Sequence, residues 1–370
     1  MMRQLIRSRS LTHPLMLVLA VIILAAAACG GQQSAGPAVS AAAPASGAAK
    51  APGSTPAGAA AKTVAGASKS QTVTFGVNSK TAASWPLLVA VAKGFLGQNG
   101  ITLDVIQTGS SAGLAQQLAA GSLSMGETGF PDLVRPINAG APIRIIAAEA
   151  TTPPYSLVAK PTIKQWSDLK GKTVMIGASK DVVRVFWDKM SQANGLTPND
   201  YDLAYAGSTN ARFAALHSGA VDATYLNPPF DVRAQGEGFT VLATVQEYFK
   251  DFPFTGYAAN TNWLKGNQPA AVAFLKGYMA ALAWLYDPGN QDEAVQILGK
   301  ETNTETADAL KTYGLLVGKL KIWPQDGQVP DAGMQTLLKA LVDLGDMDLP
   351  LPPTSKFIDD SVLKLARQSA

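Results

Sequence analysis

Residues 73–106 read VTFGVNSKTAASWPLLVAVAKGFLGQNGITLDVI and alternate between two kinds of apolar pattern. The short runs at 73–77 and 102–106 are rich in β-branched residues and predict strands, whereas the longer apolar stretch at 86–94 predicts a helix. Ser84 is placed to cap this helix, with Pro86 at its first position. A strand, a helix and a second strand in this order indicate an α/β layer with parallel strands.

The same alternation continues to about residue 245, and a helical region follows. Further strands are predicted at 142–148, 155–160, 173–176, 203–205, 223–226 and 240–245, with helices at 113–120, 182–194 and 212–218. After a last apolar run at 257–260, helices are predicted at 269–286, 292–298, 305–316, 333–344 and 355–365. The pattern predicts an α/β fold with largely parallel sheets. The 269–286 helix carries Lys276 and is short for a membrane span, so we expect it to be buried in the protein.

The N-terminal residues have the pattern of a secretion signal. Three arginines precede an apolar run at 15–24, and four alanines at 25–28 then lead to Cys29, the one cysteine of the chain. A lone cysteine directly after small residues resembles the lipobox of bacterial lipoproteins. We therefore expect residues 1–28 to be a lipoprotein signal peptide and Cys29 to be lipidated. The alternative is an ordinary signal peptide next to an unrelated cysteine.

Residues 29–70 predict a lipidated cysteine followed by a disordered tether. Positions 30–70 contain only Ala, Gly, Pro, Ser, Thr, Gln, Val and Lys, so they lack the apolar surface that a folded segment needs. A flexible chain of this length has a root-mean-square span of roughly 35 Å. Such a tether would hold a folded body near a membrane and leave it free to turn.

Charge and residue types exclude several functions. Without residues 1–28 the chain loses three arginines of 30 basic residues and keeps all 27 acidic ones, so its formal charge is zero. Nucleic acid is therefore not an expected partner. With Cys29 lipidated and His217 the one histidine left, common metal sites and cysteine or histidine nucleophiles are absent. We expect no metal, no cofactor and no catalytic residue.

Four sequence patterns carry a family resemblance. They are WPLLVAVAKGFLGQNGI at 85–101, LAAGSLSMG at 118–126, DLKGKTV at 168–174 and AALHSGAVDA at 214–223. Each resembles an element of the nitrate/sulfonate/taurine-type solute-binding proteins, with Ser124 where that family usually has Asp. Because all four occur in family order and spacing, the chain is identified as a member of this family. The family also includes the thiamine-pyrimidine-precursor proteins.

The resemblance implies a type II periplasmic-binding-protein-like fold, with two α/β lobes joined by a two-strand hinge and a helical C-terminal region packed on lobe one. Lobe one would contain residues 71–154 and 258–370, and lobe two residues 155–257. The hinge strands would lie at 155–160 and 254–260. Hinge closure around a small solute would then be read by the transmembrane permease subunits of an ABC importer.

Ligands of open α/β sheets bind beyond the carboxyl ends of the strands, where helix N-termini meet. The loops at 78–85, 109–111, 178–181 and 207–210 offer backbone N–H groups and hydroxyls that suit an oxyanion. These serines and threonines also suit the simpler task of capping their own helices. Asn227 stands where relatives often carry Glu, and its amide would weaken selection for cationic ligands.

The predicted ligand-binding set contains hydroxyl and amide residues, aromatic residues and two cations. Its members are Ser79, Ser110, Ser111, Thr128, Ser179, Asn227, Trp85, Phe130, Tyr155, Phe230, Lys180 and Arg184. For the aromatic residues, core packing is an equal alternative, and the two cations are also placed to pair with nearby carboxylates on the surface.

These observations predict an exported, lipid-anchored and monomeric receptor in the periplasm or on the outer face of the cell membrane. Its ligand would be a small organic anion, sulfonate-like in character. Two alternatives remain: a receptor for a neutral pyrimidine-like ligand, or an enzyme of the same fold acting on a pyrimidine or aromatic compound. A structural or sensory lipoprotein without transport is a third.

Overall fold

A computed structural model describes residues 70–249 and 252–368. The predicted signal peptide at 1–28, the lipidation of Cys29 and the tether up to residue 69 lie outside the described residues. The described residues all belong to one unit of the chain.

Sheet one has five strands in the order β2-β1-β3-β10-β4. Its strands are β1 (Gln71–Val77), β2 (Ile101–Gln107), β3 (Met125–Gly129), β4 (Ile143–Ala150) and β10 (Thr255–Asn260). β1 pairs in parallel with β2 and β3, whereas β10 is antiparallel to both of its neighbours. The carboxyl ends of β1, β2, β3 and β4 therefore point to one edge of this sheet.

Sheet two repeats this plan in the order β7-β6-β8-β5-β9. Its strands are β5 (Ser156–Ala159), β6 (Lys172–Ile176), β7 (Tyr201–Tyr205), β8 (Ala223–Leu226) and β9 (Thr240–Thr244). Here β5 is the antiparallel strand, lying between β8 and β9. Each sheet thus has one antiparallel strand in the fourth place of its strand order.

The two antiparallel strands explain how the chain links the sheets. β5 follows sheet one directly in the chain but pairs in sheet two, and β10 follows sheet two but pairs in sheet one. The chain therefore crosses between the sheets twice, before β5 and before β10, which confirms the predicted two-lobe fold class. The sequence boundary at residue 257 falls inside β10, so residues 255–257 pair in sheet one. We refer to sheet one with its helices as lobe one and to sheet two with its helices as lobe two.

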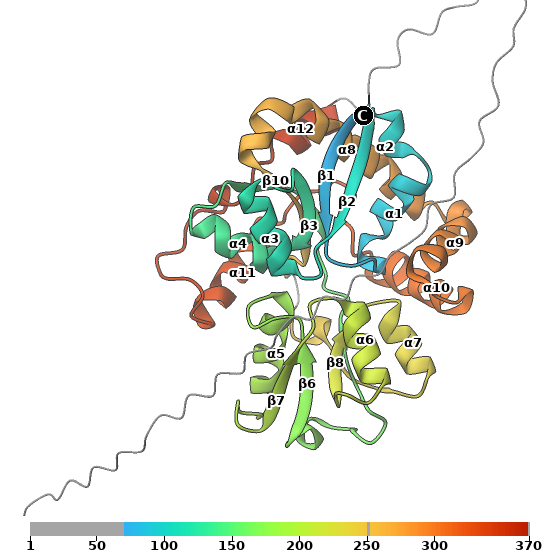
Figure 1. The fold of residues 1–370 in the computed structure, drawn as a ribbon, viewed down its shortest axis with the longest axis vertical. Coiled ribbons are helices and arrows are strands. Elements are labelled where there is room, and N and C mark those ends of the chain that lie inside the picture. The colour runs from blue at the N-terminus through green and yellow to red at the C-terminus, as the bar shows by residue number, and fades with distance from the viewer. Residues whose placement is uncertain (1–69, 250–251, 369–370) are drawn as a thin grey trace, which may run out of the picture. The chain divides into compact units, whose positions relative to one another are not determined.

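Short helices connect the strands of each sheet (Figure 1). Lobe one has α1 (Trp85–Ala92), α2 (Phe95–Gln98), α3 (Ser111–Ala120) and α4 (Phe130–Asn138). Lobe two has α5 (Val182–Ala193), α6 (Thr209–His217) and α7 (Phe230–Gly236). Ser110, Asp181 and Ser208 cap α3, α5 and α6, because each side chain accepts a backbone N–H from the first turn.

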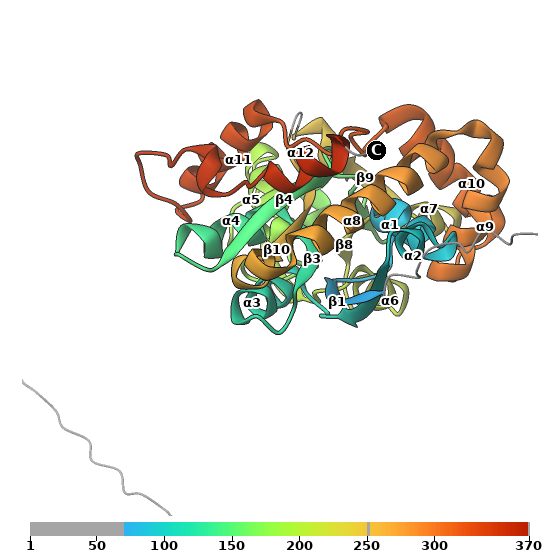
Figure 2. The ribbon, with the colours of Figure 1, turned by 90° about the horizontal axis from the view of Figure 1, so that it is seen from above.

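The C-terminal helices are α8 (Thr261–Tyr286), α9 (Gln291–Thr302), α10 (Thr306–Tyr313), α11 (Asp331–Asp343) and α12 (Ser361–Gln368). α8 is long and apolar enough to span a membrane, but half of its apolar window is buried inside the protein. It packs against α1, α2 and α12, and α12 in turn packs on β4 (Figure 2). α8 is therefore a core helix of lobe one. It starts eight residues before the predicted helix, with a kink at Asn267 close to Pro269.

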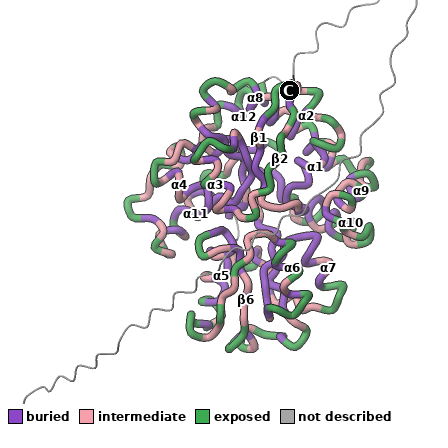
Figure 3. The backbone as a smooth tube through the Cα atoms, viewed as in Figure 1, coloured by how far each residue is buried: buried purple, intermediate pink, exposed green. Residues whose placement is uncertain are grey.

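Buried residues are concentrated on β1, β3, β4 and β10 of sheet one and on β5 and β8 of sheet two (Figure 3), whereas the edge strands β2 and β7 are mostly exposed or half-buried. In lobe one, Phe75 stacks on Phe274 at a centroid distance of 5.2 Å, and Tyr257 meets Tyr278 edge to face at 4.8 Å. These rings come from β1, β10 and α8, so the inserted strand and the long helix belong to the same core.

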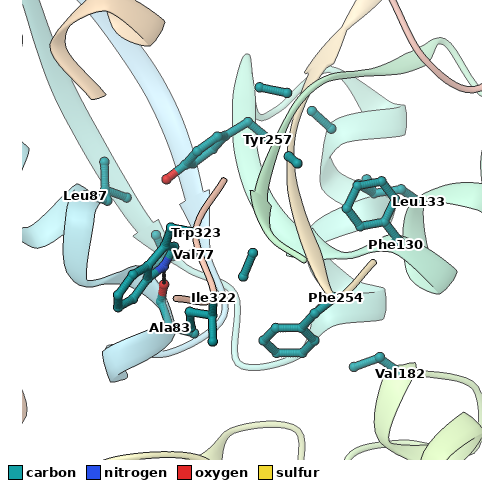
Figure 4. Close-up of a cluster of buried hydrophobic side chains, with 14 of the residues drawn as sticks. Val77, Ala83, Leu87, Phe130, Leu133, Val182, Phe254, Tyr257, Ile322 and Trp323 are labelled. Atoms are coloured by element: carbon teal, nitrogen blue, oxygen red, sulfur yellow. Dashed lines mark hydrogen bonds between the residues drawn. The ribbon is translucent and has the colours of Figure 1, made fainter. Parts of the chain in front are cut away.

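The segment at residues 321–329, which we call the strap, ties the C-terminal region to the turn before α1 and to the segment that follows β4. Trp323 is 1% exposed, and its Nε1 donates to the Ala83 carbonyl at 2.7 Å (Figure 4). The Ile322 carbonyl accepts from the Thr151 N–H at 2.8 Å, in the segment that leaves β4 toward lobe two. The strap therefore holds the start of α1 and one interlobe crossing in place.

We expect Trp323→Ala to lower the free energy of unfolding by about 3–5 kcal/mol, because it leaves a cavity and orphans the Ala83 carbonyl. Chemical denaturation measures this change. Leu349→Ala, at a side chain that is 71% exposed, is the control and should change stability little. Equal unfolding curves for Trp323→Ala and the wild type would contradict the proposed role of the strap.

Candidate ligand-binding site

A small cavity of about 40 Å³ lies between the two lobes. Lobe one contributes Asn78 and Ser79 after β1, Ser84, Ser111, Glu127, Thr128 and Glu149, and lobe two contributes Val182 and Asn227. Tyr155, Phe254 and Thr255, next to the two crossings, complete the wall. The cavity lies at the carboxyl ends of β1, β3, β4 and β8, as expected for an open α/β sheet.

Two buried carboxyl groups, Glu127 and Glu149, stand on the strands that flank β10. Glu127 lies on β3 opposite Tyr257 of β10. Glu149 lies on β4 at a register shift, because Ala148 pairs with Gly256 and Ala150 pairs with Thr255. Glu149 is thus the extra residue of a β-bulge, a feature that redirects a side chain from the regular alternation of the strand. The bulge places a carboxyl group beside the cavity.

The hydrogen bonds of the two carboxyl groups differ. The Ser84 hydroxyl donates to Glu127 Oε1. The Tyr257 hydroxyl donates to Glu149 Oε1 at 3.3 Å. Ser84 was predicted to cap α1, but its side chain makes no capping bond there. The prediction was wrong because Glu127, distant in sequence, lies within reach of the hydroxyl.

The electrostatics of this pair favour one proton on Glu149. Burial raises the pKa of Glu149 well above its usual range, and the neighbouring Glu127 raises it further. Burial also raises the pKa of Glu127, but the interactions with Glu149 and Ser84 oppose that shift. Two close carboxyl groups cannot easily both ionise. Glu149 is therefore the member of the pair that more readily holds a proton.

Two buried amide oxygens of the cavity wall have no hydrogen-bond partner among the described residues. They are Asn78 Oδ1 and Asn227 Oδ1. Glu127 Oε2 has no N–H or hydroxyl donor either, but Glu127 shares a hydrogen bond with the neighbouring Glu149 carboxyl group. The amide of Asn78 is oriented by the Gly207 carbonyl, which accepts from its Nδ2 at 3.3 Å, so its oxygen faces the other way. Unpaired buried acceptors are unfavourable unless a donor meets them. The wall is therefore complementary to a molecule that donates hydrogen bonds.

The described residues lining the cavity include no lysine, arginine or histidine. Arg212 is 1% exposed and lies over the Tyr155 ring at 5.9 Å. However, its guanidinium donates to the carbonyls of residues 206, 207 and 225 and to the Thr209 hydroxyl. This cation holds the strand ends of lobe two together, and no charge of the wall matches a bound anion.

Direct hydrogen bonds join the lobes around the cavity. The Ala82 N–H donates to the Pro228 carbonyl at 2.9 Å, and Asn227 Nδ2 donates to the Thr81 hydroxyl at 3.3 Å. Gly207 approaches so closely that an added Cβ would lie 2.2 Å from the Gly109 carbonyl oxygen. The described structure is therefore closed over the cavity.

A second pair of buried acids, Asp132 of α4 and Asp181 at the start of α5, lies where the two helices meet. Asp132 Oδ2 accepts from the Val182 N–H of the other lobe at 3.2 Å, and Arg135 lies 3.7 Å from Oδ1. Burial raises the pKa of Asp132 well above its usual range, with Asp181 adding to the shift. The closed arrangement therefore includes a hydrogen bond whose acceptor, Asp132, can change its protonation state.

The structure brings part of the predicted set together. Ser79, Ser111, Thr128, Tyr155 and Asn227 line the cavity. Within this group Ser111 Oγ accepts from Asn78 Nδ2 at 3.4 Å, and the Thr128 hydroxyl donates to the Ser111 carbonyl at 3.4 Å. Their role in ligand binding stays a prediction.

The other seven predicted residues lie elsewhere. Trp85 and Phe130 are fully buried in lobe one, where Trp85 Nε1 donates to the Ala294 carbonyl at 3.1 Å. Phe230 packs on Phe213 in lobe two at 5.6 Å. Ser110 caps α3, Ser179 is exposed, Lys180 lies 3.5 Å from Asp346, and Arg184 pairs with Asp188 at 2.6 Å.

The predicted ligand-binding set did not include Asn78, Glu127 or Glu149, although Asn78 begins the predicted ligand loop at 78–85. A signal for Glu149 was available, since it is the one acid in the apolar strand IRIIAAEA at 143–150. A carboxyl group inside a fully buried strand is rarely placed there for packing. Asn78 directly follows β1, the position where strand ends meet ligands.

These features define a class of protein by its architecture: two α/β lobes, two crossings and a cleft at the strand ends form the type II periplasmic binding protein fold. The NMT1/THI5-like family model matches residues 81–293, more than half of the chain. The chain belongs to this family, which is consistent with the resemblance seen in its motifs.

Individual relatives support the same class. YtlA of Bacillus subtilis (strain 168) is 28% identical over 222 residues, which cover 56% of this chain and 64% of YtlA. The chain thus spans less than two thirds of that relative. The periplasmic nitrate-binding protein NrtA of Synechocystis PCC 6803 superposes with a TM-score of 0.69 at 17% identity, covering 80% of this chain and 88% of NrtA. The alkanesulfonate-binding protein SsuA of Xanthomonas axonopodis pv. citri, bound to MOPS, gives 0.64 at 16% identity, covering 79% and 99%.

The raised pKa of Glu149 predicts a pH-dependent stability. A carboxyl group whose pKa is raised by folding stabilises the fold at low pH, and this contribution is lost as the pH rises through the folded-state value. We expect the wild type to lose stability relative to Glu149→Gln as the pH rises above 4.5. Chemical denaturation at about pH 5 and about pH 8 measures this. Glu305→Gln, at an exposed position, is the matched control. Parallel pH profiles for Glu149→Gln and the wild type would show that Glu149 is not held protonated.

The close approach of Gly207 predicts that Gly207→Ala keeps the lobes apart. The new Cβ would meet the Gly109 carbonyl at 2.2 Å and Ser110 Cβ at 2.6 Å. We expect a larger radius of gyration in small-angle X-ray scattering than for the wild type, with both lobes still folded by circular dichroism. Gly236→Ala, with no atom within 4 Å of the added Cβ, is the control. A wild-type radius for Gly207→Ala would contradict the closed contact at this loop.

Proposed function

We propose that this protein is the extracytoplasmic solute receptor of an ABC importer and that its ligand is a small nitrogen compound rich in N–H donors. The unpaired amide oxygens of Asn78 and Asn227, with the buried acidic Glu127 beside them in the cavity wall, support this proposal. An N–H donor would satisfy Glu127 Oε2 and form a charge-assisted bond in a site shielded from water.

A sulfonate, the ligand type first expected from the sequence, fits this wall poorly. Sulfonate oxygens only accept hydrogen bonds, and they would face the acceptors Glu127 Oε2 and Asn78 Oδ1 without a cationic side chain in the described wall. Burying an anion beside a carboxylate is strongly unfavourable. The neutral pyrimidine-like ligand, the alternative from the sequence, has ring nitrogens and an amino group that match the acceptors and hydroxyls better.

An enzymatic role has little support among the described residues. His217 does not line the cavity; its side chain is 60% exposed and lies 3.1 Å from Glu237 at the end of α6. The hydroxyls of Ser84 and Tyr257 donate to Glu127 and Glu149. Among the described residues that line the cavity there is no cysteine or histidine that could act as a nucleophile. The receptor function requires only that the ligand join the two lobes, after which the permease subunits recognise the closed form.

The location follows from the same class. Export and lipid attachment through Cys29 are part of the proposal, with the folded receptor acting outside the cytoplasm. Cys29→Ser should then release the protein from the membrane fraction. Retention of Cys29→Ser in washed membranes would contradict the anchor.

Calorimetry with two probes tests the ligand class. We expect 4-aminopyrimidine to bind the wild-type protein and MOPS not to bind. Glu127→Gln should weaken 4-aminopyrimidine by about tenfold or more, since a hydrogen bond to a charged group contributes about 1.5–3 kcal/mol. Glu293→Gln, on an exposed carboxylate paired with Lys93, controls for the change of charge. Binding of MOPS without binding of 4-aminopyrimidine would reject the proposed ligand class.

A further inference from the structure

An apolar groove in lobe one lies beside the interlobe cavity. It has a volume of about 160 Å³ and is walled by Val77 of β1, Leu87, Leu88 and Val91 of α1, and Leu103 and Val105 of β2. Val77 and Leu87 are seen on this side of sheet one in Figure 4. β2 is an edge strand of sheet one, so no further strand covers the groove on that side.

The groove and the cavity share part of their walls. Ser79, Ser84 and Glu127 line both. The Ser84 hydroxyl donates to one oxygen of Glu127, and no N–H or hydroxyl group of the described residues donates to the other. A molecule bound to Glu127 therefore has the groove as a neighbouring space, without crossing the second lobe.

The volumes of the two spaces differ in a way that matters for a ligand. The cavity between the lobes has a volume of about 40 Å³. The groove is four times larger and mainly apolar. The groove therefore offers more room for an apolar substituent than the cavity between the lobes does.

Two apolar side chains of the groove are exposed to solvent. Val91 is 56% exposed and Val105 is 44% exposed, although both belong to regular elements of a folded lobe. Two of the groove's polar members, Lys80 and Glu301, form an ion pair at 2.6 Å and are partly exposed, so they lie toward solvent. The groove thus has an apolar floor, a polar rim and an acidic inner end.

We infer that this groove binds the apolar substituent of the transported solute, while its N–H donor head group binds Glu127. The ligand class is then a nitrogen heterocycle or related head group that carries a short alkyl or aryl chain. This inference rests on the proposed function, because the head group at Glu127 sets the direction of the chain.

Two probes with one head group test the inference by calorimetry. They are 4-aminopyrimidine and 4-amino-6-butylpyrimidine. We expect the butyl probe to bind about tenfold or more tighter, which corresponds to burial of about two of its four carbon atoms.

Neighbouring residues of β2 provide matched variants. Val105 lines the groove, whereas Ile106 does not, because successive side chains of a strand point to opposite faces. Both are exposed, at 44% and 36%, so Asp is tolerated at either position. Val105→Asp should remove the advantage of the butyl probe, and Ile106→Asp should keep it.

The outcomes separate this inference from the proposed function. Equal affinity for the two probes, or loss of the butyl advantage in both variants, would overturn the groove as a substituent site and leave the receptor function intact. Failure of both probes to bind would reject the donor-type head group, and the groove assignment would fall with it. A butyl advantage abolished by Val105→Asp alone supports the inference.

Discussion

The contact between two buried carboxyl groups is the constraint around which the site is built. Glu127 and Glu149 lie on β3 and β4, separated by β10. The Tyr257 hydroxyl of β10 reaches Glu149, and Ser84 of the turn before α1 reaches Glu127. These positions depend on β10, which follows lobe two in the chain and inserts into sheet one between β3 and β4. Without β10 and the bulge at Glu149, the acids would not meet at one cavity.

The same insertion of strands explains why closure and ligand binding are linked. The chain leaves β4 next to Glu149 and returns into β10 next to Thr255, so both crossings border the acid pair. Tyr155 and Phe254 pack edge to face at 5.5 Å between these crossings. A ligand bound at Glu127, as we propose, would lie beside both crossings, and lobe two contacts lobe one there through Asn227, Gly207 and Val182.

Much of the fold was predictable from the sequence because it depends on local patterns. The alternation of apolar runs predicted the α/β layers, and four ordered motifs predicted the family and fold class, which are confirmed. The site was less predictable, because its key contacts are distant in sequence. Ser84 looks like a helix cap until Glu127 is placed beside it. Lys180 looks like an anion ligand until Asp346, far along the chain, approaches to 3.5 Å. Trp85 and Phe130 are buried by tertiary packing, which no local pattern distinguishes from ligand contact.

The central claim is that the buried carboxylate of Glu127 selects a ligand with N–H donors. Native mass spectrometry of the protein purified without denaturation tests this most directly, because a co-purified solute is identified by its mass and composition. The account predicts a small nitrogen-containing compound that is absent from Glu127→Gln prepared in the same way. A co-purified sulfonate or other anion, retained by both proteins, would contradict it.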